Sequence, residues 1–161
     1  MMKVLRIILV VLMIGFLLTT EVWSTDIRIP SQPGVVNSHN SFSETVKRLK
    51  GAIRARNLTV VFELNYEEIM GAAGIEGKNL VTIGFVGPEM KHDILRAEPK
   101  AALEIPLRIA VRELDDGAVD VIYYQPSYLI SHYQNRDLDK LKQKMDILVG
   151  SIIKEGAGAN R

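Results

Sequence analysis

The side chains best suited to bind a metal ion or to transfer a proton lie in one short segment. Glu89, His92 and Asp93 fall within five residues, and on a helix Glu89 and His92 would share a face because they are three residues apart. Imidazole and carboxylate groups are common metal ligands, and a histidine beside a carboxylate can exchange protons near neutral pH. A solvated helix face shows the same pattern, and we favour it because charged side chains are mostly exposed.

Two further charged residues lie in segments that are expected to be β-strands. Glu63 belongs to the β-branched segment 58–64 and Arg108 to the segment 107–114. Because strand side chains alternate between faces, either can point into a cleft, and Arg108 with Glu63 or Glu104 could hold a small anion. A plain surface ion pair explains the same residues, and we favour it because such pairs are common and weak.

Tyrosines gather near the last expected strand and the turn that follows Pro126. This segment contains Tyr123, Tyr124, Tyr128 and Tyr133. A tyrosine combines an apolar ring with a hydroxyl group, which suits ligand grooves and protein interfaces. Packing beneath the C-terminal helix is the simpler alternative, but Tyr124 and Tyr128 are the best candidates for a binding surface.

The sequence lacks several motifs on which common chemistries depend. With no cysteine among its 161 residues, the chain has no thiol nucleophile and no cysteine-ligated metal site. It contains no G-x-S-x-G serine elbow and no glycine-rich phosphate loop, and we expect no cofactor. A net charge of +1 argues against nucleic-acid binding, which needs a basic face to neutralise phosphates.

The N-terminus, residues 1–24, has the pattern of an export signal. Lys3 and Arg6 precede an apolar run at 7–18, and a short segment ending in Ser24 follows. We predict cleavage after Ser24, which makes the domain periplasmic or secreted. The alternative is an uncleaved membrane anchor with the domain outside, although the run is shorter than the ~20 apolar residues that span a bilayer. Only this segment is expected to contact the membrane.

The rest of the chain is predicted to form one domain with irregular ends. Residues 25–34 contain two prolines and a glycine and are expected to be a linker. Residues 35–154 form the predicted domain, and residues 155–161 are small and polar, which is typical of a flexible tail. Hydrophobic periodicity predicts strands at 35–38, 58–64, 79–86, 107–114 and 118–124, and helices at 41–57, 66–73, 89–97 and from 137 or 139 to 154.

The clearest local signal lies between the last two expected strands. Asp115, Asp116 and Gly117 separate them, and this sequence is typical of a tight β-hairpin, so the two strands must be antiparallel. The order of elements predicts an α+β fold in two layers, β-α-β4-α. We expect a curved, mainly antiparallel sheet with helices on one face, because that arrangement buries the apolar side of each element.

The sequence resembles a known family in several segments. These segments are Ser41–Leu49, Leu58–Leu64, Gly84–Pro88 and Ile105–Pro126. Over roughly residues 35–130, their order and spacing resemble domain-of-unknown-function family 302. The resemblance implies a β-α-β4-α domain that often forms a dimer, and it implies no established activity. Many members carry cysteines where this chain has Val86 and Leu107, so thiol chemistry in those relatives is not open to this protein.

Two functions from different classes are therefore predicted. The favoured one is a non-enzymatic module that binds a small ligand or another protein, or that forms a homodimer. Its candidate ligand-binding residues are Tyr124, Tyr128, Arg108, Glu63 and His92, and no catalytic or metal-binding residue is assigned. The alternative is a small exported metal-dependent or acid/base enzyme that uses His92, Glu89 and Asp93. Convergence of these three side chains in one pocket would favour the enzyme.

Overall fold

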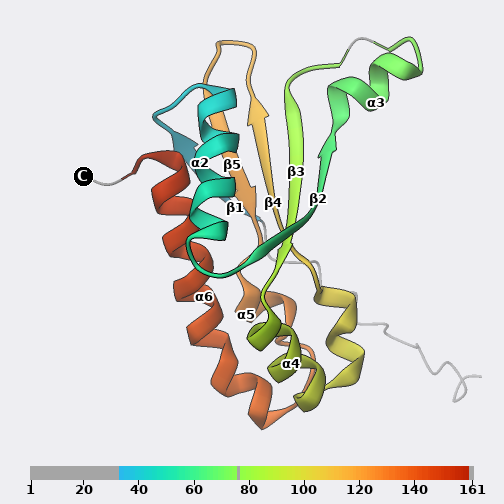
Figure 1. Cartoon of the computed structure of the whole chain (residues 1–161), viewed down its shortest axis with the longest axis vertical. Helices are drawn as coiled ribbons and strands as arrows, with labels where there is room; N and C mark the ends of the chain where they lie inside the picture. The colour runs from blue at the N-terminus through green and yellow to red at the C-terminus, as the bar shows by residue number, and fades with distance from the viewer. Residues whose placement is uncertain (1–32, 76, 160–161) are drawn as a thin grey trace, which may run out of the picture. The chain divides into compact units, whose positions relative to one another are not determined.

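An antiparallel sheet of five strands forms the centre of the domain (Figure 1). The computed structural model describes residues 33–75 and 77–159. Its strands are β1 (Gly34–Ser38), β2 (Thr59–Asn65), β3 (Leu80–Val86), β4 (Leu107–Glu113) and β5 (Val119–Tyr123). They are arranged in the order β1-β5-β4-β3-β2, and every neighbouring pair is antiparallel. The predicted signal or anchor, residues 1–24, lies outside the described residues.

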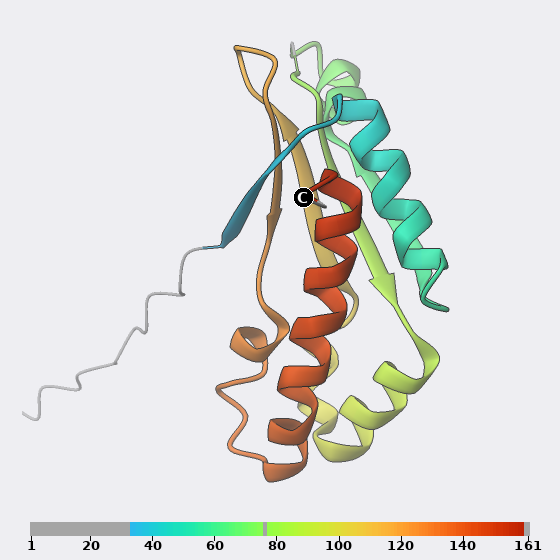
Figure 2. The ribbon, with the colours of Figure 1, turned by 90° about the vertical axis from the view of Figure 1, so that its left-hand side faces the viewer.

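Two long helices cover one face of this sheet. The helices are α2 (Phe42–Arg54), α3 (Tyr66–Ala72), α4 (Pro88–Ala97), α5 (Pro126–Leu129) and α6 (Arg136–Ala157), with a 3-10 helix, η1 (Pro99–Glu104). Helices α2 and α6 lie side by side across the sheet, while α4, η1 and α5 gather at one end of it (Figures 1 and 2). The Ser41 side chain caps α2 by accepting a hydrogen bond from the Glu44 backbone N–H, which satisfies a donor that the helix cannot pair itself.

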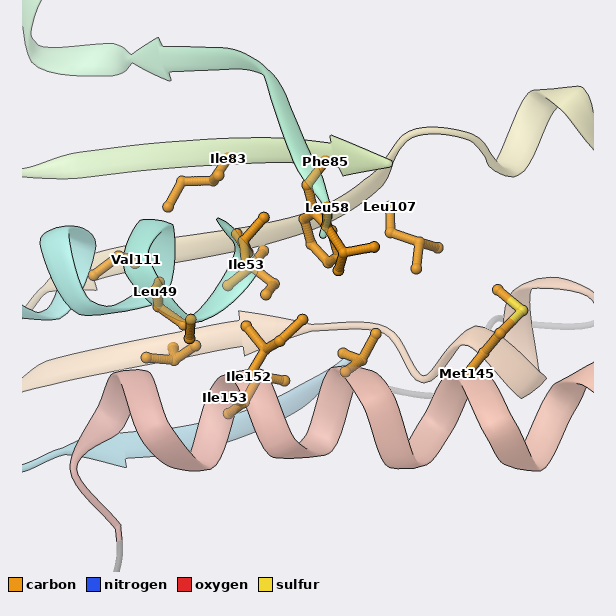
Figure 3. Close-up of a cluster of buried hydrophobic side chains, with 14 of the residues drawn as sticks. Leu49, Ile53, Leu58, Ile83, Phe85, Leu107, Val111, Met145, Ile152 and Ile153 are labelled. Atoms are coloured by element: carbon orange, nitrogen blue, oxygen red, sulfur yellow. The ribbon is translucent and has the colours of Figure 1, made fainter. Parts of the chain in front are cut away.

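The hydrophobic core lies between the sheet and these two helices. Alternate side chains of β3 and β4 point toward the helices, because strand residues alternate between faces. Ile83 and Val111 are fully buried there against Leu49 of α2 and Ile152 of α6 (Figure 3). The opposite face of the sheet carries Arg108 together with Val35, which is 55% exposed.

The α+β fold predicted from the sequence is confirmed. The five strands, their β-α-β4-α order and the helical layer on one face of the sheet all agree with the prediction. The expected hairpin forms between β4 and β5, where Gly117 has a φ of 81°, a backbone conformation that glycine adopts without steric cost.

The C-terminal helix extends further than the sequence predicts. It ends at Ala157 rather than near Lys154, and Gly158 terminates it in the left-handed conformation with a φ of 72°. Gly156 and Ala157 are buried, and the Ala157 carbonyl accepts a hydrogen bond from the His39 backbone N–H at 2.9 Å. The prediction of a flexible tail from residue 155 is therefore wrong for residues 155–157. The glycine at 156 accommodates the close approach of Leu49 on α2.

Among residues 33–75 and 77–159, none of the helices combines the length and apolar character needed to cross a bilayer.

Candidate functional site

Helix α4 separates two cavities at the end of the sheet. Gly87 and Pro88 end β3 and begin α4, and proline suits the first helical turn, where its missing N–H would have no intrahelical partner. Ile94 anchors the helix to the core and is only 1% exposed. On either side of this anchor, α4 presents one face to a cavity that we call the inner pocket and another to a cavity that we call the cationic groove.

The inner pocket lies between α4, α6 and the turn that joins α2 to β2. It has a volume of about 350 Å³ and is the more enclosed of the two cavities. Its walls are mainly apolar and include Leu58, Met90, Ile94, Leu141, Met145 and Leu148. Figure 3 shows Met145 on the same helix as Ile153, but set apart from the cluster of side chains that surrounds Ile153. Met145 thus lines the pocket from a position on α6 between the buried residues Leu138 and Val149.

Charged side chains of both signs face the inner pocket. Glu89 and Asp93 come from α4, and Lys144 comes from α6. No ion pair joins Lys144 to either carboxylate within the described part of the chain. Arg56 also lines the pocket, but its guanidinium is held by Glu155 at 2.9 Å. The side chains of Glu89 and Lys144 are thus free to contact a polar group of a bound molecule.

The cationic groove lies on the other side of α4, next to β2. It is more open than the inner pocket and has a volume of about 740 Å³. Lys91, His92 and Arg96 line it together with apolar side chains such as Val61 and Leu95. Because residues four apart on a helix share a face, Lys91 and Leu95 form one row of this wall, and His92 and Arg96 form the next.

The candidate enzyme cluster is divided between these two cavities. His92 lines the cationic groove, whereas Glu89 and Asp93 line the inner pocket. The His92 side chain is 69% exposed, and its Nδ1 lies 3.3 Å from Asp93 Oδ1. No group of three histidine, aspartate or glutamate side chains in the described residues is placed to hold a metal ion. These three side chains therefore do not converge in one pocket.

Glu63 and Arg108 lie on opposite faces of the sheet. A β-bulge between Val60 and Phe62 shifts the register of β2 against β3, and such a bulge reverses the alternation of side chains beyond it. Glu63 therefore points toward α2, where its Oε2 accepts a hydrogen bond from Lys50 Nζ at 2.8 Å. Arg108 belongs to the opposite face, beside Gly84.

Glu104, the other carboxylate considered as a partner for Arg108, interacts with different side chains. Its Oε1 accepts a hydrogen bond from the Tyr133 hydroxyl at 3.2 Å and lies 3.7 Å from His132 Nε2. Burial raises the pKa of the Tyr133 hydroxyl, and the negative charge of Glu104 raises it further. The predicted anion site built from Arg108 and one of these carboxylates does not form in this arrangement.

Two of the four tyrosines form a pair. The rings of Tyr124 and Tyr128 stack with their centroids 5.8 Å apart and an angle of 24° between their planes. Tyr124 is partly exposed at the end of β5, and neither ring lines the inner pocket or the cationic groove. Tyr133 lies against η1 instead, where its hydroxyl also donates a hydrogen bond to the Lys100 carbonyl. The tyrosines therefore do not form one continuous surface.

Sequence reasoning identified α4 but missed most of the residues that make its two walls. No role was predicted for Lys91, Arg96, Lys144 or Met90. One signal was present in the sequence, because the acids of α4 fall at 89 and 93 while its bases fall at 91 and 96. Glu89 and Asp93 share a face and Lys91 lies away from it, but Arg96 is three residues from Asp93 and adjoins the acidic face. Only the packing therefore shows which cavity each side chain lines.

A five-stranded antiparallel sheet with helices on one face defines a small two-layer α+β domain. The family model for "Domain of unknown function DUF302" matches residues 35–153, so the chain belongs to this family, as its sequence predicts. It is similar to the crystal structure of an uncharacterized conserved protein DUF302 from Bacillus stearothermophilus, with a TM-score of 0.70 and 14% identity. The likeness covers 76% of this chain and 96% of that one. No curated protein matches the chain.

Proposed function

We propose that this domain is a non-enzymatic module that binds a small, largely apolar molecule in the inner pocket. The observation that carries the proposal is the pocket itself, which has a volume of about 350 Å³ and mainly apolar walls. Small-molecule sites are typically concave, mostly apolar cavities of ~300–1,000 Å³ with a few polar groups. The inner pocket has each of these properties, and it lies between structural elements that the core holds in place.

The side chains of the pocket suggest how a ligand is held. Met90 and Met145 supply flexible, polarisable contacts, and methionine adapts to apolar ligands of different shape. Glu89 on α4 and Lys144 on α6 provide charges of opposite sign on different walls. A ligand with an apolar body and a polar end is therefore the class that this pocket suits.

Lys144 provides a direct way to test the proposal. Reductive methylation modifies accessible lysine amines, and peptide mass spectrometry measures the rate at each lysine. We use indole as a neutral, apolar probe and the full chain in phosphatidylcholine nanodiscs. Indole should slow methylation of Lys144 in a saturable way and leave Lys140, which is exposed and outside the pocket, unchanged.

A pair of neighbouring tryptophan variants makes this test specific. Leu148→Trp places an indole ring in the pocket wall, so Lys144 should react slowly without added probe and indole should have no further effect. Ile147→Trp is the matched control, because Ile147 is 65% exposed and lies outside the pocket. Indole protection of Lys144 that persists in Leu148→Trp, or that is absent from the wild-type protein, would contradict the proposal.

We also propose that the domain lies outside the membrane, periplasmic or secreted. The basic residues before the apolar run at 7–18 support this location. Export can end with a cleaved signal or with an uncleaved membrane anchor. Intact mass spectrometry of the protein from its own cell envelope distinguishes these two outcomes. A chain that starts near Thr25 indicates a cleaved signal, and one that starts at Met1 indicates an anchor. Recovery of the protein from the cytoplasmic fraction would contradict export by either route.

Interaction with another protein, including a second copy of the chain, stays a prediction. The stacked pair of Tyr124 and Tyr128 and the exposed Arg108 support a contact surface rather than a pocket. Light scattering on the purified protein measures whether a homodimer forms. Tyr124→Ser would then weaken the dimer if this surface makes the contact, and an unchanged dimer would exclude it.

A further inference from the structure

We propose that the cationic groove is a second binding site, independent of the inner pocket, for a small amphiphilic carboxylate. Such a molecule consists of a hydrocarbon chain with one carboxylate at its end. The groove combines two features that this chemistry requires, namely cations that form no ion pair among the described residues and an apolar wall beside them. Both features come from residues on α4, β2 and β3 that line the groove together.

The charge of the groove has one sign. Lys91 and Arg96 line it, and no aspartate or glutamate does so in the described part of the chain. Neither cation forms an ion pair within residues 33–75 and 77–159. Arg96 acts on Asp137 only weakly, because the pKa of that carboxyl is lowered mainly by its hydrogen bond from Lys140. Arg96 is therefore available to pair with a carboxylate, which guanidinium groups bind in a bidentate geometry.

His92 adds a third polar group to the same wall. Its Nδ1 interacts with Asp93 at 3.3 Å, and the side chain as a whole is exposed on the groove side of α4. In the neutral ring the nitrogen that donates to the Asp93 carboxylate carries the only N–H, so Nε2 can only accept, and it donates only when the ring is protonated. His92 thus extends the polar wall of α4, with Asp93 as its neighbouring acid.

The apolar part of the groove explains why a bare anion is not the expected occupant. Val61 lies at the β-bulge of β2 and is 49% exposed, and Val86, Pro88 and Leu95 continue the surface from β3 to α4. Exposed apolar area favours a ligand that removes it from water. A volume of about 740 Å³ leaves room for a hydrocarbon chain beside the cations.

Lys91 reports on this site in the same way that Lys144 reports on the inner pocket. Octanoate is the probe, and the full chain is held in phosphatidylcholine nanodiscs, which carry no net charge. At a concentration about ten times its Kd, octanoate should slow methylation of Lys91 roughly tenfold. Lys144 should be affected much less, because it lies on the other side of α4.

Two comparison ligands, one matched to octanoate in charge and one in chain length, separate this proposal from simpler explanations. Acetate has the carboxylate without the chain, and equal protection by acetate would mean an adventitious ion only. Octyltrimethylammonium has the chain with the opposite charge, and equal protection by it would exclude recognition by the cations. If nanodiscs containing phosphatidylglycerol protect Lys91 without octanoate, the groove binds an anionic lipid headgroup, and the proposal of a free carboxylate is wrong.

A substitution on the same wall completes the test. Arg96→Gln should lower octanoate protection of Lys91 at least about fivefold, because it removes the bidentate partner. Arg54→Gln is the matched control, since Arg54 is exposed on α2 and lies outside the groove. Val61→Ser should weaken the protection of Lys91 by octanoate but not its protection by acetate. Unchanged octanoate protection in both Arg96→Gln and Val61→Ser would overturn the assignment.

Discussion

The two halves of α6 differ in how closely they pack. In the C-terminal half, Gly156 lies so near Leu49 that a Cβ atom on the glycine would be 2.3 Å from its Cδ2. In the N-terminal half, Leu141 and Met145 face the inner pocket, together with Leu148 just past the midpoint of the helix. One helix therefore closes the core against α2 and leaves a cavity beside α4. Gly156 permits the close approach of Leu49, whereas larger side chains form the wall of α6 that faces the pocket.

Charged side chains of the domain also differ in whether they are paired. On the sheet face opposite the helices, Asp120 is buried and accepts hydrogen bonds from Arg112 at 2.7 Å and Asn37 at 3.2 Å. Near the open half, Glu89 and Lys144 have no partner among the described ion pairs. Paired charges fix the strands in register, whereas unpaired charges beside a cavity are available to a ligand.

Ile94→Ala should have the largest effect on stability. Ile94 is the fully buried contact between α4 and the core, and truncation of such a residue costs about 2–5 kcal/mol. Urea unfolding measures the free energy of unfolding. Leu95→Ala is the control, because Leu95 is only half-buried on the groove side. An equal loss in the free energy of unfolding for the two variants would show that Ile94 does not anchor α4 to the core. The walls of the two cavities would then not be fixed.

Gly156→Ala should destabilise the closed half of α6. The added methyl group would overlap Leu49, and overpacking of this kind costs about 1–3 kcal/mol. Gly150→Ala provides a matched control on the same helix, because no atom outside the helix lies within 4 Å of its added Cβ. That variant should be more stable by about 0.5–1 kcal/mol, since alanine favours a helix interior over glycine. An unchanged free energy of unfolding in Gly156→Ala would contradict the close packing of α6 on α2.

Asp120→Asn should lower the free energy of unfolding by about 1–3 kcal/mol, because a buried hydrogen-bond partner is lost. Arg96→Gln, beside the open half, should change it by no more than about 0.5 kcal/mol. The same urea titration measures both variants. If the two had equal effects, the distinction between paired structural charges and free charges beside a cavity would fail.

The pH dependence of stability provides a second measurement of Asp120. The hydrogen bond from Arg112 holds the pKa of its carboxyl below the ordinary value of 3.8. The native state therefore binds its proton less readily than the unfolded chain, so the stabilisation is fully present above that value and is lost as the pH falls through the native pKa. The side chain in Asp120→Asn does not titrate. The difference in the free energy of unfolding between wild type and this variant should therefore shrink as the pH falls below the ordinary carboxyl pKa. A difference that stays constant down to pH 2 would contradict the assigned cause.

Leu148→Trp should have only a small effect on stability. The larger side chain enters a cavity instead of a packed core, so we expect a change within about 1 kcal/mol. Thermal unfolding beside Ile147→Trp measures the difference. A strongly destabilised Leu148→Trp variant would show that the space beside Leu148 is closed.

Local sequence features predicted most of the fold. The Asp-Asp-Gly turn before Ala118 and the Ser41 cap act over a few residues, so both could be identified without tertiary information. The α+β class followed from the order of these elements. Residues Gly156 and Ala157 were assigned to a tail because their small size is typical of frayed ends, and only the approach of α2 explains why small residues are needed there.

The candidate site was less predictable because it depends on contacts between distant segments. The bulge beside Val61 moves Glu63 to the helical face of the sheet, and nothing in the β-branched sequence of β2 indicates an extra residue. His92 and Asp93 are neighbours in the sequence, yet they line different cavities. The sequence predicts which residues α4 contains, while its position against α6 and β2 decides what each face contacts.

Native mass spectrometry of the protein, purified gently from its own envelope, tests the central claim most directly. The inner pocket should retain a small organic molecule, detected as added mass that is lost when the protein is unfolded. Ile147→Trp should carry the same added mass as the wild-type protein, and Leu148→Trp should carry none. The claim is contradicted if the wild-type protein has no adduct and indole fails to protect Lys144, or if Leu148→Trp retains the adduct.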